Sequence, residues 1–518
     1  MKKNRLNIIG LILLFLALLA TYLFLNIKTN TYPWKNNIQI ARHSVDYVLG
    51  FASLCVFLAV ILKINKYLRI VVYFFVIIMF VNIMASASGF FIYKENFTKE
   101  MAYSTLSTSF REVSSIQSTL GFPLFFSVLY TLLFAFLIEK LSKIIKVNFV
   151  SILASTIWVI LPIVWVCKEK YDIEKYRKSH PGYGVHFVEP KFVFQTMNSF
   201  YGGFDYLMKI RSIKNFKADF SSISKIEKFQ DDEIDKIIVV LGESARVQNM
   251  SLYGYGRATT PEADKERQNM FVYNNAVSPA FVTYQAVPLT LSNISMDNYA
   301  ESNFSQIADN IISVGQNFNR KSYWITGTKS EEEYLLTYNA NQLIETKAMY
   351  DEEMLPHFRK LLNKKEKQLI VLHLLGSHSD AKNNYPKSHN VFKKDNTVDA
   401  YDNSITYSDY LLGQIFSDLK GTNSALLYYS DHGQAHSNDK FFHSQSKSAN
   451  RVPLFMWYGD KVPTSMREIG VENKETSTKI VYSLVLRLMG LENSKTEAYQ
   501  PAKFLKDGEV VFFNQLKE

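Results

Sequence analysis

Two apolar runs of the sequence end directly in side chains that bind metals. Glu243 follows the β-branched run 237–241, and Asp431 and His432 follow the apolar run 425–429. Runs of this length and type are typical of strands buried on both faces of a parallel sheet. In open α/β sheets, ligands bind at the carboxyl ends of the strands. The sequence therefore places two carboxylates and an imidazole where a site is expected.

Thr283 stands where a helix is expected to begin. A threonine at a helix start is usually a capping residue, so by itself it indicates no chemistry. A threonine hydroxyl becomes a useful nucleophile when metal coordination lowers its pKa, and a helix amino terminus favours a bound phosphate. Carboxylates, imidazoles and a hydroxyl together suit a metal ion that stabilises phosphoryl charge.

Histidines are concentrated in the same part of the chain. Seven of the ten lie between residues 357 and 443. His378, His436 and His443 cluster in sequence with Asp431 and His432, which favours a site over a surface turn. Of the remaining histidines in this part of the chain, we expect His373 within a strand and His357 and His389 at the surface.

Composition divides the chain in two. Residues 1–230 carry 27 Lys and Arg against 12 Asp and Glu, and residues 231–518 carry 31 against 36, so net charges of +15 and −5 give the total of +10. The basic half flanks apolar segments and offers no basic face, so we expect no nucleic-acid partner. The only cysteines are Cys55 and Cys167, which leaves no disulfide in the soluble part.

Five apolar segments approach or exceed the length of about 20 residues that a helix needs to cross a bilayer. They are residues 6–26, 45–62, 68–92, 120–138 and 149–166. Lys and Arg are densest at the amino terminus and in the second and fourth loops, and the positive-inside rule therefore puts the amino terminus in the cytoplasm. With five spans, everything after Val166 is expected outside the membrane, which in a Gram-negative cell is the periplasm.

The domains expected are a transmembrane domain over 1–167, an interfacial amphipathic connector over 168–230 and a periplasmic catalytic domain over 231–518. From residue 231 apolar strands alternate with amphipathic helices, which predicts an α/β sandwich with a largely parallel sheet. Expected strands are 237–241, 322–325, 368–374, 425–429 and 453–457, and expected helices include 401–419 and 477–489.

The chain resembles the membrane-anchored phosphoethanolamine transferases of the alkaline-phosphatase and sulfatase superfamily. The five-span anchor matches, and so do motifs in the same order along the chain. The sequence of the motif Leu252-Tyr253-Gly254-Tyr255 is closer to the lipopolysaccharide-core branch than to the lipid A branch. The other matching motifs are Gly242-Glu243-Ser244, Thr283 with Val287-Pro288, His373-Leu374-Leu375-Gly376-Ser377-His378 with Tyr385-Pro386, Tyr401-Asp402-Asn403-Ser404, and Ser430-Asp431-His432-Gly433.

This resemblance implies an alkaline-phosphatase-like α/β/α sandwich behind a multi-pass α-helical membrane domain. It makes Thr283 the nucleophile and, with Glu243, Asp431 and His432, a ligand of Zn²⁺. His378 and His443 would contact the substrate or a second metal. The implied donor is phosphatidylethanolamine in a membrane of lipids, and the implied acceptor is lipid A, lipopolysaccharide core or another glycan, reached through a covalent phospho-threonine.

The chain departs from the family pattern at two positions of the implied substrate site. Gln434 stands where the family has Glu, and Gly327 replaces a polar contact, which leaves Lys329 as a candidate phosphate contact. Two other functions stay open. One is a glycerophosphate transferase similar to lipoteichoic acid synthases, which use manganese, although a histidine-rich site favours zinc. The other is an inactive membrane scaffold.

Overall fold

The computed structural model divides the chain into two compact units, Met1–Leu207 and Met208–Glu518. Most of the expected connector, and residues 157–166 of the fifth expected span, lie outside the described residues. Those described are 2–28, 37–64, 66–93, 97–107, 117–153, 155–156, 196, 199–200, 202–204, 207–208, 226–232, 234–300, 304–327, 336–346, 349–378, 381–394, 396–437, 439–493, 500–506 and 508–518.

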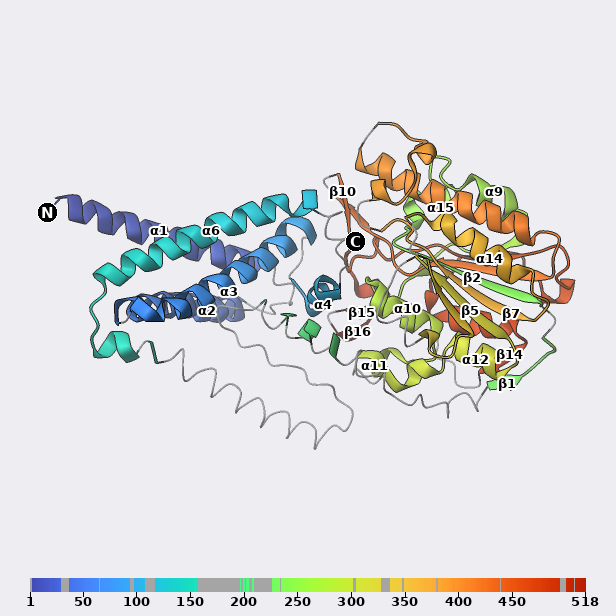
Figure 1. Ribbon diagram of the computed structural model, residues 1–518, viewed down its shortest axis with the longest axis horizontal. Helices are drawn as coiled ribbons and strands as arrows, with labels where there is room; N and C mark the ends of the chain where they lie inside the picture. The colour runs from blue at the N-terminus through green and yellow to red at the C-terminus, as the bar shows by residue number, and fades with distance from the viewer. Residues whose placement is uncertain are drawn as a thin grey trace. The chain divides into compact units, whose positions relative to one another are not determined.

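The first unit is a bundle of long helices (Figure 1). Tyr22, Phe51 and Phe134 are fully buried at its centre, with ring centroids 5.6 Å apart for Tyr22 and Phe51 and 5.8 Å apart for Phe51 and Phe134. These rings come from three different helices, so aromatic packing ties the bundle together. The long helices are α1 (Lys2–Lys28), α2 (Asn37–Ile64), α3 (Arg69–Ser88) and α6 (Gln117–Ile144).

The outside of this bundle is apolar. Phe125 and Leu132 on α6 and Ile77 on α3 are all more than 60% exposed. Such side chains cost free energy in water and suit a lipid environment. Among the described residues, four helices are long and apolar enough to cross a membrane, with spans Ile8–Leu25, Tyr47–Ile64, Arg69–Ile92 and Leu120–Ile144. They correspond to the first four expected segments.

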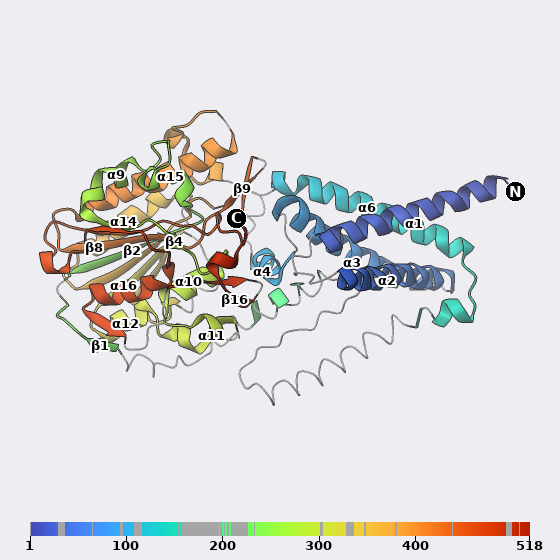
Figure 2. The ribbon, with the colours of Figure 1, turned by 180° about the vertical axis from the view of Figure 1, so that it is seen from behind.

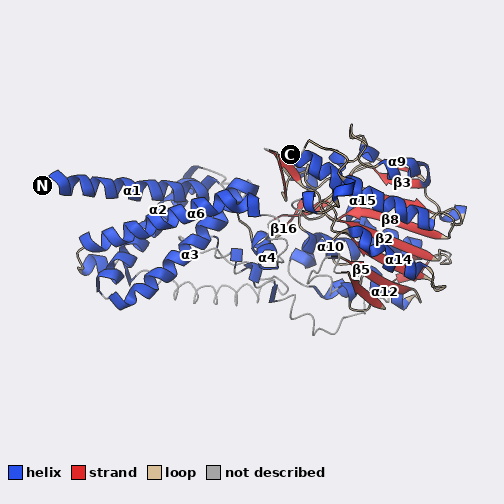
Figure 3. Cartoon of the chain, turned by 45° about the horizontal axis from the view of Figure 1, so that its top comes forward, coloured by secondary structure: helices blue, strands red, loops and turns tan. Residues whose placement is uncertain are grey.

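The second unit is built on an eight-stranded mixed sheet (Figure 3). Its order from edge to edge is β12 (Gly470–Glu472), β3 (Met270–Tyr273), β11 (Leu454–Tyr458), β8 (Ser424–Ser430), β2 (Lys236–Gly242), β7 (Gln368–His373), β5 (Lys321–Thr326) and β6 (Gln342–Glu345). Strands β8, β2, β7, β5 and β6 run parallel to their neighbours in this group. Only β11 is antiparallel, to both β8 and β3.

The central strands are apolar along their whole length because helices cover both faces of the sheet. Every residue of β8 and β7 is buried, and every residue of β2 except Lys236. Figures 1 and 2 show α9 (Pro261–Glu266), α14 (Leu355–Leu362) and α15 (Thr397–Leu419) on one face. The other face carries α10 (Thr283–Leu291), α12 (Ile311–Asn317) and α16 (Val481–Leu488).

The structure confirms the expected sandwich and corrects some boundaries. The expected helix 401–419 begins earlier, at Thr397, because the Asn396 side chain accepts a hydrogen bond from the Asp399 N–H and caps it. The expected helix 477–489 opens as a 3-10 turn, Thr478–Ile480, before α16. Three strands of this sheet were not predicted. The edge strands β12 and β6 are short and partly exposed, without a continuous apolar run, and β3 is mostly buried but has only four residues.

Candidate metal-dependent active site

The site residues converge because β2 and β8 are parallel neighbours. Gly242 and Ser430, the last residues of these strands, are paired, and the Asp431 N–H donates to the Gly242 carbonyl at 3.1 Å. Glu243 and Asp431 therefore leave the sheet side by side. Thr283, the first residue of α10, lies against them, although it is 40 residues from Glu243 in the chain.

The Thr283 hydroxyl contacts other residues of the site and does not cap its helix. Val282 holds the capping position of α10, and its side chain makes no capping hydrogen bond. The Thr283 Oγ1 donates to Glu243 Oε2 at 2.9 Å and lies 3.3 Å from His432 Nε2. The hydroxyl thus sits between a carboxylate and an imidazole at the amino terminus of a helix, where a phosphate is favoured.

A strained turn orients Glu243. Ser244 has a φ of +60°, a left-handed conformation that is unfavourable for a residue with a Cβ. Its N–H donates to Asp431 Oδ1 at 3.1 Å, and its hydroxyl donates to Glu243 Oε1 at 2.6 Å. The Tyr401 hydroxyl donates to the Ser244 carbonyl at 2.6 Å. The turn is therefore fixed by Asp431, which directly follows β8, and by Tyr401 on α15, and it directs one carboxylate against another.

The two carboxylate oxygens of Asp431 have different surroundings. Oδ1 accepts the N–H groups of Ser244 and His432, whereas Oδ2 is buried and forms no hydrogen bond with any described residue. Burial, together with the negative charge of Glu243, raises the pKa of Asp431 to about 6. An unsatisfied buried carboxylate oxygen beside a second carboxylate fits a bound cation.

His432 presents one nitrogen to the same space. Its Nδ1 lies 3.0 Å from the Gly433 carbonyl, and a neutral ring that donates there leaves the Nε2 lone pair available to a metal. Nε2 lies 3.3 Å from Asp431 Oδ2 and 3.5 Å from Glu243 Oε1. The imidazole and both carboxylates therefore face one point.

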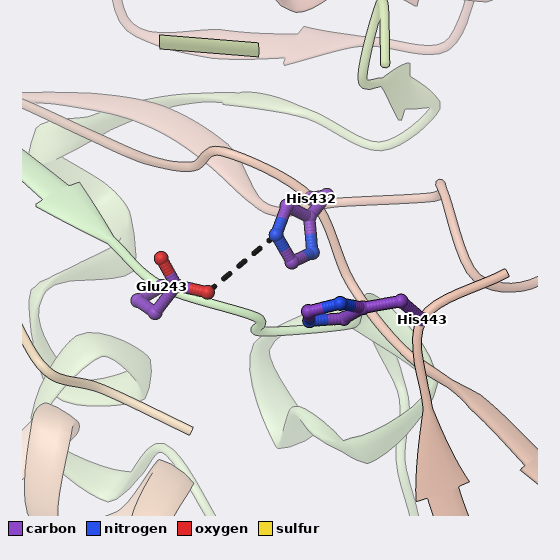
Figure 4. A group of neighbouring side chains, drawn as sticks. All are labelled: Glu243, His432 and His443. Carbon is purple, nitrogen blue, oxygen red and sulfur yellow. Dashed lines mark ion pairs between the residues drawn. The ribbon is translucent and has the colours of Figure 1, made fainter. Parts of the chain in front are cut away.

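His443 joins this group from the hairpin formed by β9 (Ala435–Ser437) and β10 (Lys440–Phe442). Single ligand atoms of Glu243, His432 and His443 all lie within 4.8 Å of one another. Figure 4 shows these three side chains close together. His443 Nε2 is buried and has no hydrogen-bond partner among the described residues. Burial and the neighbouring imidazoles of His432 and His378 hold the pKa of His443 well below its usual value, so the ring is neutral and able to bind a metal.

The remaining predicted site residues lie at different distances from this centre. The His378 ring centroid is 6.0 Å from that of His443. The Gln434 side chain is buried, and its Nε2 is 3.5 Å from the Ser377 carbonyl, at the limit of a hydrogen bond. Lys329 lies outside the described residues.

Asp351 is a supporting residue that the sequence did not reveal. It is fully buried and accepts the Leu375 N–H at 2.7 Å and the Gly376 N–H at 3.1 Å, which fixes the loop that leads to His378. Gly376 in that loop has a φ of +52°, and a Cβ there would lie 2.7 Å from the Glu243 carbonyl oxygen. Only the glycine in the quoted motif hinted at this close approach.

Comparison with known proteins assigns the second unit. Residues 235–491 match the model of the family described as Sulfatase. This region is a sulfatase-family domain. The chain is 36% identical over 305 residues to the "Putative transferase YhbX" of Escherichia coli K12, an alignment that covers 55% of each protein, so the chain spans about half the length of that relative.

Two longer matches cover more of the chain than the sulfatase-family domain, and the second of them includes membrane helices. The chain is 28% identical over 396 residues to the "Phosphoethanolamine transferase EptA" of Helicobacter pylori, with 70% of each chain covered. Its fold matches the integral membrane lipooligosaccharide phosphoethanolamine transferase A of Neisseria meningitidis, with a TM-score of 0.64, 17% identity and coverage of 93% of this chain and 97% of that one. The resemblance to phosphoethanolamine transferases and the expected fold class are thus confirmed. The closeness to the lipopolysaccharide-core branch stays a prediction.

Proposed function

We propose that this protein transfers phosphoethanolamine from phosphatidylethanolamine to a sugar-containing acceptor of the cell envelope, such as lipid A, lipopolysaccharide core or another glycan. The observation that carries the proposal is the Thr283 hydroxyl, held 2.9 Å from Glu243 and 3.3 Å from His432 at the start of α10. A hydroxyl that donates to a carboxylate at a helix amino terminus is prepared to attack a phosphoryl group.

The reaction proceeds in two transfers. In the first, Thr283 Oγ1 bonds to phosphorus and its proton passes to Glu243. The bond from phosphorus to the diacylglycerol oxygen breaks, and this oxygen takes the proton from Glu243, so diacylglycerol leaves as an alcohol. In the second, a hydroxyl oxygen of the acceptor bonds to phosphorus and gives its proton to Glu243, while the bond to Thr283 Oγ1 breaks and Thr283 takes the proton back. The α10 amino terminus stabilises negative phosphoryl charge in both transfers.

Zinc suits the donor set. Glu243, Asp431, His432 and Thr283 would hold it, with His443 as a further ligand and His378 beside the substrate. The support is the pair of buried atoms without hydrogen-bond partners among the described residues, Asp431 Oδ2 and His443 Nε2. Mixed carboxylate and imidazole ligands are typical of zinc sites. When bound, zinc lowers the pKa of a coordinated hydroxyl and polarises phosphoryl oxygens.

The membrane helices give such an enzyme access to a lipid donor. We propose that the chain is a multi-pass protein of the bacterial inner membrane, with a membrane domain over 1–167, a connector over 168–230 and a periplasmic catalytic domain over 231–518. The four apolar helices and the asymmetry of Lys and Arg between loops support this arrangement.

Mass spectrometry of the purified full chain tests the proposal. Incubation with phosphatidylethanolamine and zinc, without acceptor, is expected to add phosphoethanolamine to the peptide containing Thr283. The control is the Thr283→Val protein, which keeps the side-chain shape and gains no adduct. A glycerophosphate adduct formed from phosphatidylglycerol instead would establish the lipoteichoic-acid-synthase-like alternative. An adduct on Ser278 or Thr290 would overturn the assignment of Thr283.

A further inference from the structure

A cavity of about 430 Å³ opens beside the amino-terminal end of α15, and none of the residues that line it belongs to the site around Thr283. Sites for small ligands have volumes of roughly 300 to 1,000 Å³, so this one holds a group the size of a sugar. Its lining combines amides, aromatic rings and ammonium groups, and includes Asn383, Tyr385, Lys387, Asn390, Phe392 and Asn403.

Several of these groups match parts of a charged sugar. Asn383 and Asn390 are exposed, and their side-chain amides can both donate and accept hydrogen bonds, as sugar hydroxyls require. Tyr385 and Phe392 supply apolar surface for the C–H groups of a sugar ring. Lys387 is exposed and forms no ion pair with a described residue, so its ammonium is available to a phosphate or carboxylate.

The segment that forms the cavity wall is strongly basic. Residues 381–394 contain four lysines and one histidine but no Asp or Glu. Asp399 also lines the cavity, and its charge is offset by the Arg257 guanidinium at 2.8 Å and by the Lys394 N–H at 2.6 Å. The wall therefore favours an anion over a neutral or cationic ligand.

Buried hydrogen bonds hold the wall in place. Asn403 on α15 is fully buried, and its Nδ2 donates to Asn390 Oδ1 at 2.7 Å and to the Phe392 carbonyl at 2.9 Å. Its Oδ1 accepts the Phe392 N–H at 2.8 Å. A wall fixed in this way loses little conformational freedom when a ligand binds, which improves affinity.

The same wall is joined to the active site by two hydrogen bonds. Asn384, which follows the lining residue Asn383, donates from Nδ2 to the His378 carbonyl at 3.0 Å. Ser404, which follows Asn403, donates from its hydroxyl to Ser377 Oγ at 2.8 Å. The cavity therefore adjoins the loop that carries His378.

We propose that this cavity binds a sugar that carries an anionic group, such as a phosphorylated hexosamine. In the reaction proposed above, it positions the acceptor glycan next to the active-site loop. The second statement rests on the proposed function, whereas the first does not.

Binding of glucose 6-phosphate to the full chain tests the cavity directly. Saturation-transfer NMR in a detergent without a sugar headgroup avoids competition from the detergent. Glucose 6-phosphate is expected to bind about tenfold more tightly than glucose or inorganic phosphate alone, because one charge-assisted contact adds about that factor to the sugar contacts. Lys387→Glu is expected to weaken this binding by at least about tenfold.

Lys393→Glu is the matched control, because it makes the same charge change on an exposed residue of the same segment that does not line the cavity. It is expected to change binding by less than about twofold. Equal effects of the two substitutions, or no binding of glucose 6-phosphate to the wild-type chain, would overturn the proposal.

Transfer assays separate this inference from the proposed function. With a phosphorylated glycolipid as acceptor, Lys387→Glu is expected to raise the KM for the acceptor about tenfold, as it weakens binding. If wild-type protein binds glucose 6-phosphate but transfers nothing, the proposed function fails and the cavity assignment stands. If wild-type protein transfers and Lys387→Glu has the same KM, the acceptor assignment fails and the function stands.

Discussion

At the amino ends of the central strands a buried charge has partners on every side. Arg320, just before β5, is 1% exposed. Its guanidinium donates to the Asp232 carboxylate, with Nε 3.0 Å from Oδ2, and to the backbone carbonyls of Ile234 and Gln368. Asp232 also pairs with Lys367 at 3.5 Å. This charge is neutralised and fully hydrogen-bonded, which makes its burial compatible with a stable fold.

At the carboxyl ends of the same strands, two acidic side chains lie close together. Glu243 is 4% exposed and Asp431 is fully buried, and among the described residues neither pairs with a Lys or Arg. Burying two carboxylates together is costly unless a cation lies between them. The comparison separates a charge that serves the scaffold from charges that serve a function. Substitutions at four residues test this division.

Thr283→Val should have the largest effect, on activity alone. Removal of a nucleophile that acts as part of a unit leaves only residual catalysis, so we expect a loss of at least about a thousandfold in transfer. The thermal unfolding temperature should stay unchanged, because the hydroxyl is half-buried and the shape is kept. Thr283→Ser retains the hydroxyl and should keep measurable activity. Equal inactivity of the Ser and Val variants would count against a nucleophilic role.

Arg320→Met should affect stability alone. It removes one of the two cationic partners of Asp232 and the side-chain donor to the buried carbonyls of Ile234 and Gln368. We expect a loss of about 3 kcal/mol in the free energy of unfolding. The estimate is at the low end for a buried pair because Asp232 is 22% exposed. Denaturation of the purified protein measures it. Transfer per folded molecule should equal that of the wild type, and a selective loss of activity would remove the distinction between the two ends.

Asp431→Asn should separate metal binding from folding. The amide keeps the shape but loses the charge, so zinc affinity should fall at least about a hundredfold, or about 2.7 kcal/mol. Without metal, the variant should be at least as stable as the wild type at neutral pH, because a repulsive buried carboxylate has been removed. Paired unfolding curves with and without chelator test this, and a strongly destabilised metal-free variant would contradict it.

The pH dependence of zinc affinity sharpens the same test. In the metal-free protein the pKa of Asp431 is about 6, and a protonated carboxyl cannot bind zinc. As the pH rises to about 6, deprotonation of Asp431 should therefore raise the zinc affinity of the wild type. Above pH 6 this deprotonation should add little further affinity. In Asp431→Asn this component should be absent. Isothermal titration at a series of pH values below and above 6 measures both proteins.

Substitutions at Ser244 should have the smallest effects. Ser244→Gly and Ser244→Ala both remove the hydroxyl that donates to Glu243, so both should lower activity to a similar, modest extent. Glycine relieves the left-handed backbone at +60° and alanine does not, so the glycine variant should be more stable by about 1 kcal/mol. Identical unfolding free energies would mean that the turn stores no strain.

The sequence predicted those parts of the fold that local pattern determines. All five expected strands are present because each is a buried apolar run, as in β2 and β8. The antiparallel direction of β11 was not predictable, since a buried strand has the same composition in either direction. The caps depend on single residues such as Asn396, whose role appears only when the adjoining turn is known.

The candidate site shows a similar limit. Motif resemblance identified Glu243, Thr283, Asp431 and His432, and the structure brings them into contact. The position of His443 depends on the hairpin that follows β8, which periodicity does not reveal. Asp351 was missed because it acts only through backbone N–H groups of a distant loop, and no spacing in the sequence links the two.

The long sequence separation of the site residues also sets the order in which the site forms during synthesis. Glu243 and the strand before it, β2, are made first. However, β2 pairs with the later strands β7 and β8, and the Ser244 N–H donates to Asp431, which lies 187 residues further along the chain. His443 follows later still. A ribosome must therefore complete most of the chain before any complete ligand set exists. Binding of the proposed zinc ion by the full ligand set is accordingly expected only after His443 has been made, because a chain that ends before this residue lacks one of the proposed ligands.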